Sequence, residues 1–168
     1  MLWLAALVVA GRITIDLQIG EGIPISGQTI VVLLTGYYLG YKEIALLYVS
    51  YLVGGALCNL PFFADGSHGL DVVLGKSGGY LYSFPLAAAY MQYQRQRGAS
   101  SPYIWLLHAV ISTALILLVG MLHLSAQIGL EKAWLYGVLP FLAGGLIKAV
   151  LVVLVTVAVS KYTTRLAD

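Results

Sequence analysis

Residues 139–159 read LPFLAGGLIKAVLVVLVTVAV, and this stretch decides the class of fold. It contains one charged residue, Lys148, and an apolar run of about 20 residues is typical of a helix that crosses the core of a bilayer. The bias extends through all 168 residues, of which 60% are hydrophobic and 10% are charged. An average soluble domain carries about 25% charged residues. Because a small soluble protein cannot bury so much apolar surface, most of this chain must lie in lipid.

Apolar runs separated by polar residues, glycines and prolines predict an all-α, polytopic membrane protein. We expect residues 1–168 to form a single integral membrane domain with about six transmembrane helices. The predicted helices lie near residues 1–15, 26–41, 43–61, 79–94, 103–123 and 134–160.

The distribution of lysine and arginine predicts the orientation in the membrane. With the N-terminus inside, the inner segments contain Lys42, Arg95, Arg97, Lys161 and Arg165, and the outer segments contain Arg12, Lys76 and Lys132. An excess of basic residues on short loops marks the cytoplasmic side. The sequence therefore predicts a protein of the cell membrane with both termini in the cytoplasm.

The connection over residues 59–80 differs from the other connections. It is too long for a tight turn, and it mixes charged residues, apolar residues and glycines. Glycine permits sharp or left-handed backbone, and long loops of this kind often serve as lids. We therefore expect this segment to fold back over the outer face of the bundle.

Several functional classes are excluded by the motifs. The sequence Gly75-Lys76-Ser77 lacks the first glycine of a phosphate-binding loop and does not follow a buried strand. The histidines and the single cysteine have no metal-ligand spacing, and no nucleophile, base and acid suggest a hydrolase. With a net charge of +2 and scattered basic residues, no nucleic-acid partner is expected. The sequence predicts no metal, no cofactor, no catalytic residue and no enzyme activity.

Lys148 is the residue that most strongly suggests a function. A charged lysine at the centre of a membrane costs roughly 2.5–3.5 kcal/mol, so such residues usually face a cavity or a partner. A buried lysine would suit an anionic or carbonyl-bearing ligand. The alternative is that Lys148 extends to the outer interface, because it lies near the start of its helix.

Four short motifs follow one another along the chain: residues 24–29 (PISGQT), 60–63 (LPFF), 75–87 (GKSGGYLYSFPLA) and 139–149 (LPFLAGGLIKA). In this order and spacing they resemble the BioY family, the biotin-binding S components of energy-coupling-factor (ECF) transporters. The resemblance extends from about residue 5 to residue 155. In three places the chain departs from the family pattern. Ala143-Gly144-Gly145-Leu146 replaces Pro-Gly-Asp-Leu, Lys76 replaces a proline, and Asn59 replaces a small residue.

The resemblance implies a six-helix bundle that captures biotin from outside. It also implies transport driven by two ATPase subunits through a membrane coupling subunit, which would contact Ala6 and Ala10 on the first helix. The residues expected to bind the ligand are Lys148, Tyr80, Gly79, Asn59 and Gln28. Biotin's ureido group needs a hydrogen-bond acceptor as well as a donor. With Gly145 in place of the aspartate, the pocket should lack one acceptor, and we expect Gly145→Asp to tighten binding. If it does not, either Asn59 supplies the acceptor or the ligand is not biotin.

Two other functions remain open at this stage. The chain could be an S component for another vitamin or a biotin precursor, which the change at Gly145 would permit. It could also be a membrane scaffold subunit that does not transport, in which lost ligand contacts would be unsurprising.

Overall fold

The structure is a computed structural model that describes residues 1–15, 23–98 and 101–165. The first half contains α1 (Leu2–Ala10), β1 (Thr14–Ile15), β2 (Ile25–Ser26), α2 (Gln28–Tyr38) and α3 (Tyr41–Ala56). A 3-10 turn η1 (Ala64–Gly66) and the short helix α4 (Leu70–Leu74) follow. The second half contains α5 (Gly78–Gln96), α6 (Pro102–Ile128), α7 (Leu130–Gly137) and α8 (Leu139–Arg165).

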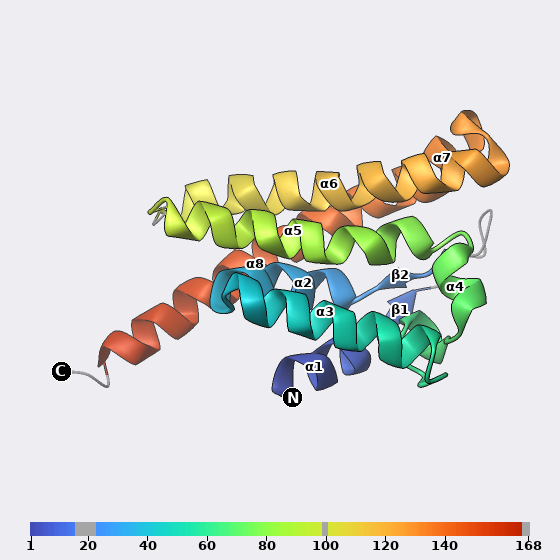
Figure 1. The fold of residues 1–168 in the computed structure, drawn as a ribbon. Coiled ribbons are helices and arrows are strands. Elements are labelled where there is room, and N and C mark those ends of the chain that lie inside the picture. The colour runs from blue at the N-terminus through green and yellow to red at the C-terminus, as the bar shows by residue number, and fades with distance from the viewer. Residues whose placement is uncertain (16–22, 99–100, 166–168) are drawn as a thin grey trace.

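The long helices form a bundle whose connections gather at its two ends (Figure 1). Helix α5 packs against α6, α2 and α3, whereas α8 packs against α6 and α2, and α1 packs against α2 and α3. The paired strands, η1, α4 and α7 lie together at one end (Figure 1). The all-α architecture predicted from the apolar runs is confirmed.

Helix length limits which elements can cross a membrane. Among the described residues, two helices are long and apolar enough to do so by themselves, Pro102–Ile128 and Leu139–Ser160. Helices α1 and α2 have 9 and 11 residues. At 1.5 Å per residue they are about half as long as the roughly 30 Å hydrocarbon core. The count of six transmembrane helices therefore stays a prediction.

The predicted first helix, 1–15, is wrong at its C-terminal end. The helix stops at Ala10, and Thr14 and Ile15 pair antiparallel with Ser26 and Ile25. The N–H of Gly27 donates to the carbonyl oxygens of Ala10, at 3.1 Å, and Ile13, at 2.9 Å. The β-branched run after Gly11 favours this extended backbone. The chain thus makes a short hairpin between α1 and α2, which the sequence interpretation missed.

The predicted last helix, 134–160, is in fact two helices. Helix α7 ends at Gly137, and Val138 leaves helical geometry with φ −122° and ψ −58°. Pro140 lies in the first turn of α8, where its missing N–H costs nothing, and it could not donate the hydrogen bond needed to continue α7 across this point. The prediction failed because an apolar pattern continues across this break.

Candidate functional site

A cavity lies inside the bundle near the end that carries the hairpin. It is lined by Ile23, Pro24, Ser26, Gln28, Thr29, Ala64, Ser77, Tyr80, Leu81, Phe84, Thr113, Ile116, Leu117, Phe141, Gly145 and Lys148. The lining comes from the hairpin, α2, α5, α6 and α8, and from the segment between α3 and α5, as expected for a covering loop. The cavity volume is about 60 Å³, whereas ligand pockets usually measure about 300–1,000 Å³. A ring-sized ligand therefore requires the lining to move apart.

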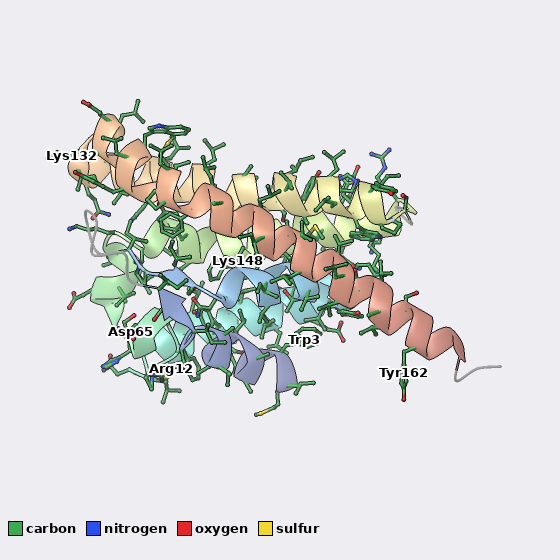
Figure 2. The ribbon with its side chains drawn as sticks, turned by 180° about the vertical axis from the view of Figure 1, so that it is seen from behind. Trp3, Arg12, Asp65, Lys132, Lys148 and Tyr162 are labelled. Atoms are coloured by element: carbon green, nitrogen blue, oxygen red, sulfur yellow. The ribbon has the colours of Figure 1, made fainter. Side chains whose placement is uncertain are left out.

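Lys148 brings a cationic group to this cavity from the third turn of α8. Its side chain is half-buried, and Nζ donates a hydrogen bond to the carbonyl oxygen of Ser26 at 2.7 Å. Figure 2 places Lys148 well inside the bundle, away from the ends of α8. It therefore reaches a polar partner within the protein, as intramembrane charges generally do.

Gln28, at the start of α2, lines the cavity but is 1% exposed. Its Nε2 donates to the Tyr51 hydroxyl at 2.5 Å and to the carbonyl oxygens of Leu7 and Phe62, both at 3.4 Å. Its Oε1 accepts from the Ser26 hydroxyl at 3.2 Å. A carbonyl oxygen can accept two hydrogen bonds. Gln28 therefore ties α1, α3 and the 59–80 segment together while keeping an acceptor for a ligand.

Tyr80 presents an aromatic ring to the cavity from the first turn of α5. Its hydroxyl donates to the carbonyl oxygen of Gly137 at 2.8 Å, and its ring stacks on Phe141 with centroids 5.9 Å apart. The ring edge contacts Gly120 of α6 so closely that an added Cβ there would overlap it. Glycines on α6 and α7 thus make the space in which the ring is held.

Two of the predicted ligand residues lie outside the cavity lining. Gly79 brings α5 close to α6, where an added Cβ would be 2.9 Å from the carbonyl oxygen of Val119. Asn59 is exposed in the turn after α3, with φ at 51°. Asparagine tolerates this left-handed backbone better than most residues. In this structure both residues have local structural roles, and a hydrogen-bond acceptor in the cavity is available from Gln28.

Ala6 and Ala10 do not form the outward face of α1. Ala10 is 9% exposed, and Ala6 packs partly buried against the core. The outward face consists of Leu2, Ala5 and Val9. Ala10 is therefore covered by the hairpin and α2 in this conformation, and the contact of a partner with Ala6 and Ala10 stays a prediction.

Several lining groups carried no signal in the sequence. The carbonyl oxygen that binds Lys148 belongs to Ser26, which is 122 positions away, and any residue type could provide it. Thr113 lies in an apolar run typical of an ordinary membrane helix, and Phe141 belongs to the 139–149 motif but was not chosen as a ligand residue. The Thr113 hydroxyl donates a hydrogen bond to the carbonyl oxygen of Ala109 at 2.9 Å. Its Cγ2 methyl group would be 2.9 Å from a Cβ added at Gly145.

The Gln28→Leu variant is expected to be less stable. It leaves the buried Tyr51 hydroxyl without its Gln28 partner, and stranding a buried polar group costs about 1–3 kcal/mol. A thermal unfolding curve of the purified protein in detergent would measure the loss. The control is Gln96→Leu, at an exposed position near the end of α5, which should leave the midpoint unchanged. Equal midpoints for both variants would contradict this role of Gln28.

Comparison with solved structures identifies the class of protein that this fold defines. The chain superimposes on the crystal structure of the S-component for biotin from an ECF-type ABC transporter with a TM-score of 0.77. The match covers 95% of this chain and 87% of that one at 23% sequence identity. The fold is therefore that of an ECF S-component.

The chain belongs to the BioY family, whose model matches residues 1–165. It is 33% identical to the probable biotin transporter BioY of Pyrococcus horikoshii, covering 84% of this chain and 82% of that protein. It is 31% identical to the biotin transporter BioY of Thermotoga maritima, covering 93% and 90%. It is thus a membrane protein of a transporter family, not an enzyme.

Proposed function

We propose that this chain is the substrate-binding subunit of an ECF-type importer and that its ligand is biotin. The observation that carries the proposal is the pairing of Lys148 with the Gln28 amide oxygen in one apolar cavity. Ser26 connects them, since its carbonyl accepts from Lys148 and its hydroxyl donates to Gln28. The cavity thus combines a cationic donor and a neutral acceptor.

This arrangement matches a ureido ring. Such a ring has one carbonyl oxygen, which accepts hydrogen bonds, and two N–H groups, which donate them. The ring carbonyl would take the place of the Ser26 carbonyl at Lys148 Nζ, and a ring N–H would donate to Gln28 Oε1. Tyr80 and Phe141 supply apolar surfaces for the rest of the bicyclic ring. The ring is therefore innermost, and the carboxylate chain points toward the hairpin end.

We propose that the chain forms a single integral membrane domain in the cell membrane. Both termini would lie in the cytoplasm. Lys42 lies in the first turn of α3, Arg95 in the last turn of α5, and Arg97 directly after α5. These helix ends lie at the end of the bundle opposite the hairpin, where α8 also ends (Figure 1). The basic residues favour that end as the inner one. The cavity then opens toward the outside, from which a vitamin arrives.

Transport requires partners, which we propose to be a membrane coupling subunit and two ATPase subunits. The outward face of α1, formed by Leu2, Ala5 and Val9, is the proposed contact for the coupling subunit. Small side chains in membrane helices let a neighbouring backbone approach closely, and Ala5 is the small residue at the centre of this face.

The Ala5→Trp variant is expected to reduce biotin uptake at least fivefold in cells that contain the coupling module. Binding to the purified subunit should change less than twofold, because Ala5 is exposed and does not line the cavity. The matched control is Ala143→Trp, at an exposed position on α8, which should support normal uptake. If uptake by Ala5→Trp stays normal, another face contacts the coupling subunit.

Restoring a carboxylate at position 145 is expected to tighten biotin binding if space is made for it. Thr113 must lose its methyl group, so the variant is Thr113→Ser with Gly145→Asp. One further hydrogen bond contributes about 0.5–1.5 kcal/mol, or roughly two- to tenfold in affinity by titration. Thr113→Ser alone is the control. Weaker binding by the double variant than by its control would contradict the proposed ring position.

The proposal is tested by uptake of labelled biotin into biotin-requiring bacteria that express the chain together with an ECF coupling module. Saturable uptake that unlabelled biotin abolishes would support it. A scaffold subunit would give no uptake above that of cells lacking the chain. An importer for another vitamin would give uptake of that vitamin and not of biotin.

A further inference from the structure

A second, more polar cavity lies directly outside the one that contains Lys148. It is lined by Thr14, Pro24, Phe63, Ala64, Asp65, Ser67, Val72, Lys76, Ser77 and Leu81. Four of these residues, Pro24, Ala64, Ser77 and Leu81, line both cavities. The outer cavity, hereafter the vestibule, has a volume of about 320 Å³, within the usual range for ligand pockets. A ligand that enters from this end passes through the vestibule.

The vestibule contains one acidic and one basic side chain, Asp65 and Lys76. Both are exposed to water, and Lys76 already has an interaction within the chain. Figure 2 shows Asp65 close to the end of the bundle and Lys148 deeper inside. The deep cavity is thus cationic, and the vestibule offers charges of both signs.

Asp65 is held in place by its surroundings. Its φ is +54°, a left-handed backbone that is unusual for a residue other than glycine. Its N–H donates to the carbonyl oxygen of Gly11 at 2.8 Å. Arg12 fixes the adjoining segment through a 2.8 Å hydrogen bond from Nη2 to the carbonyl oxygen of Pro61. The protein maintains a costly backbone conformation at the residue that brings the carboxylate to the vestibule.

We infer that the vestibule binds the α-amino acid end of an extended ligand, namely biotin joined through an amide to the side-chain amine of lysine. This inference rests on the proposed function, which places the ring at Lys148 and directs the carboxylate chain outward. The amide conjugate continues that chain and ends in an ammonium and a carboxylate. Asp65 attracts the ammonium and Lys76 attracts the carboxylate. Free biotin, which is shorter and lacks the ammonium, uses only part of this space.

The test compares three ligands by titration of the purified full-length protein: free biotin, its lysine amide, and its butylamide, which lacks both charges. The lysine amide is expected to bind about tenfold more tightly than the butylamide. Asp65→Asn and Lys76→Gln should each reduce this preference about threefold, because exposed ion pairs contribute about 0.2–1 kcal/mol. High salt should reduce the preference as well. Asparagine keeps the left-handed backbone at position 65 accessible.

The controls are Asp71→Asn and Lys132→Gln, which remove exposed charges outside the vestibule lining and should leave the preference intact. The inference is overturned if free biotin binds but the two amides bind equally well. It is also overturned if Asp65→Asn weakens both amides to the same extent, since that result indicates a structural role. If none of the three ligands binds, the proposed function fails, and the inference fails with it.

Discussion

The Lys148→Ala variant is expected to bind biotin more than tenfold more weakly than the unmodified chain. Lys148 Nζ is the cationic donor of the deep cavity and already donates to a carbonyl oxygen, that of Ser26. A hydrogen bond that involves a charged group contributes about 1.5–3 kcal/mol, or roughly a tenfold to a hundredfold change in affinity. Titration of the purified variant measures this directly.

Two further variants separate the donor from the rest of the side chain. Lys148→Met keeps a long apolar side chain and removes the donor, so it should weaken binding about as much as Lys148→Ala. Lys132→Ala removes an exposed lysine on α7 and should bind normally. Neither Lys148 variant should unfold the protein, because removing a charge from the membrane interior relieves a cost. A loss of less than threefold in affinity would show that the ring carbonyl binds elsewhere.

The Gly120→Ala variant is expected to weaken biotin binding at least tenfold through the Tyr80 ring. An added methyl group at Gly120 overlaps the ring edge, and overpacking of this kind typically costs about 1–3 kcal/mol. The ring can move only by giving up its hydrogen bond to Gly137 or its stacking on Phe141. Either movement changes the aromatic surface available to a ligand.

The matched control is Gly144→Ala on α8, where an added Cβ would be 3.9 Å from the Cγ2 of Ile25, an ordinary contact. This variant should bind biotin as the unmodified chain does. Tyr80→Phe removes only the hydroxyl and should have a smaller effect than Gly120→Ala. If Gly120→Ala binds biotin normally, the position of the Tyr80 ring does not govern the site.

The elements that could be predicted from the sequence are those in which the apolar pattern alone determines the structure. Helices α5 and α6 begin and end within a few residues of the predicted ranges, apart from a longer C-terminal turn in α6. In both cases a run of apolar residues is bounded by polar residues, proline or glycine. The hairpin and the break at Val138 could not be found this way, because local hydrogen bonds and a proline decide them within apolar sequence.

The candidate site was predicted in part, and the omissions have a physical basis. Lys148 stood out because a charge within an apolar run is costly, and Tyr80 was expected from the family resemblance. Gln28 was chosen from a motif, but its burial among Leu7, Tyr51 and Phe62 depends on three separate segments. Ala6 and Ala10 have the spacing of residues on one helix face. In the structure that face packs against the core, which the spacing alone could not indicate.

The most direct test of the account is a binding titration of the purified, full-length, unmodified protein with biotin. The account predicts saturable binding of one biotin per chain, and other vitamins should not compete for the site. The affinity of Lys148→Ala for biotin should be more than tenfold weaker. Absence of biotin binding by folded protein would contradict it, as would equal binding by Lys148→Ala.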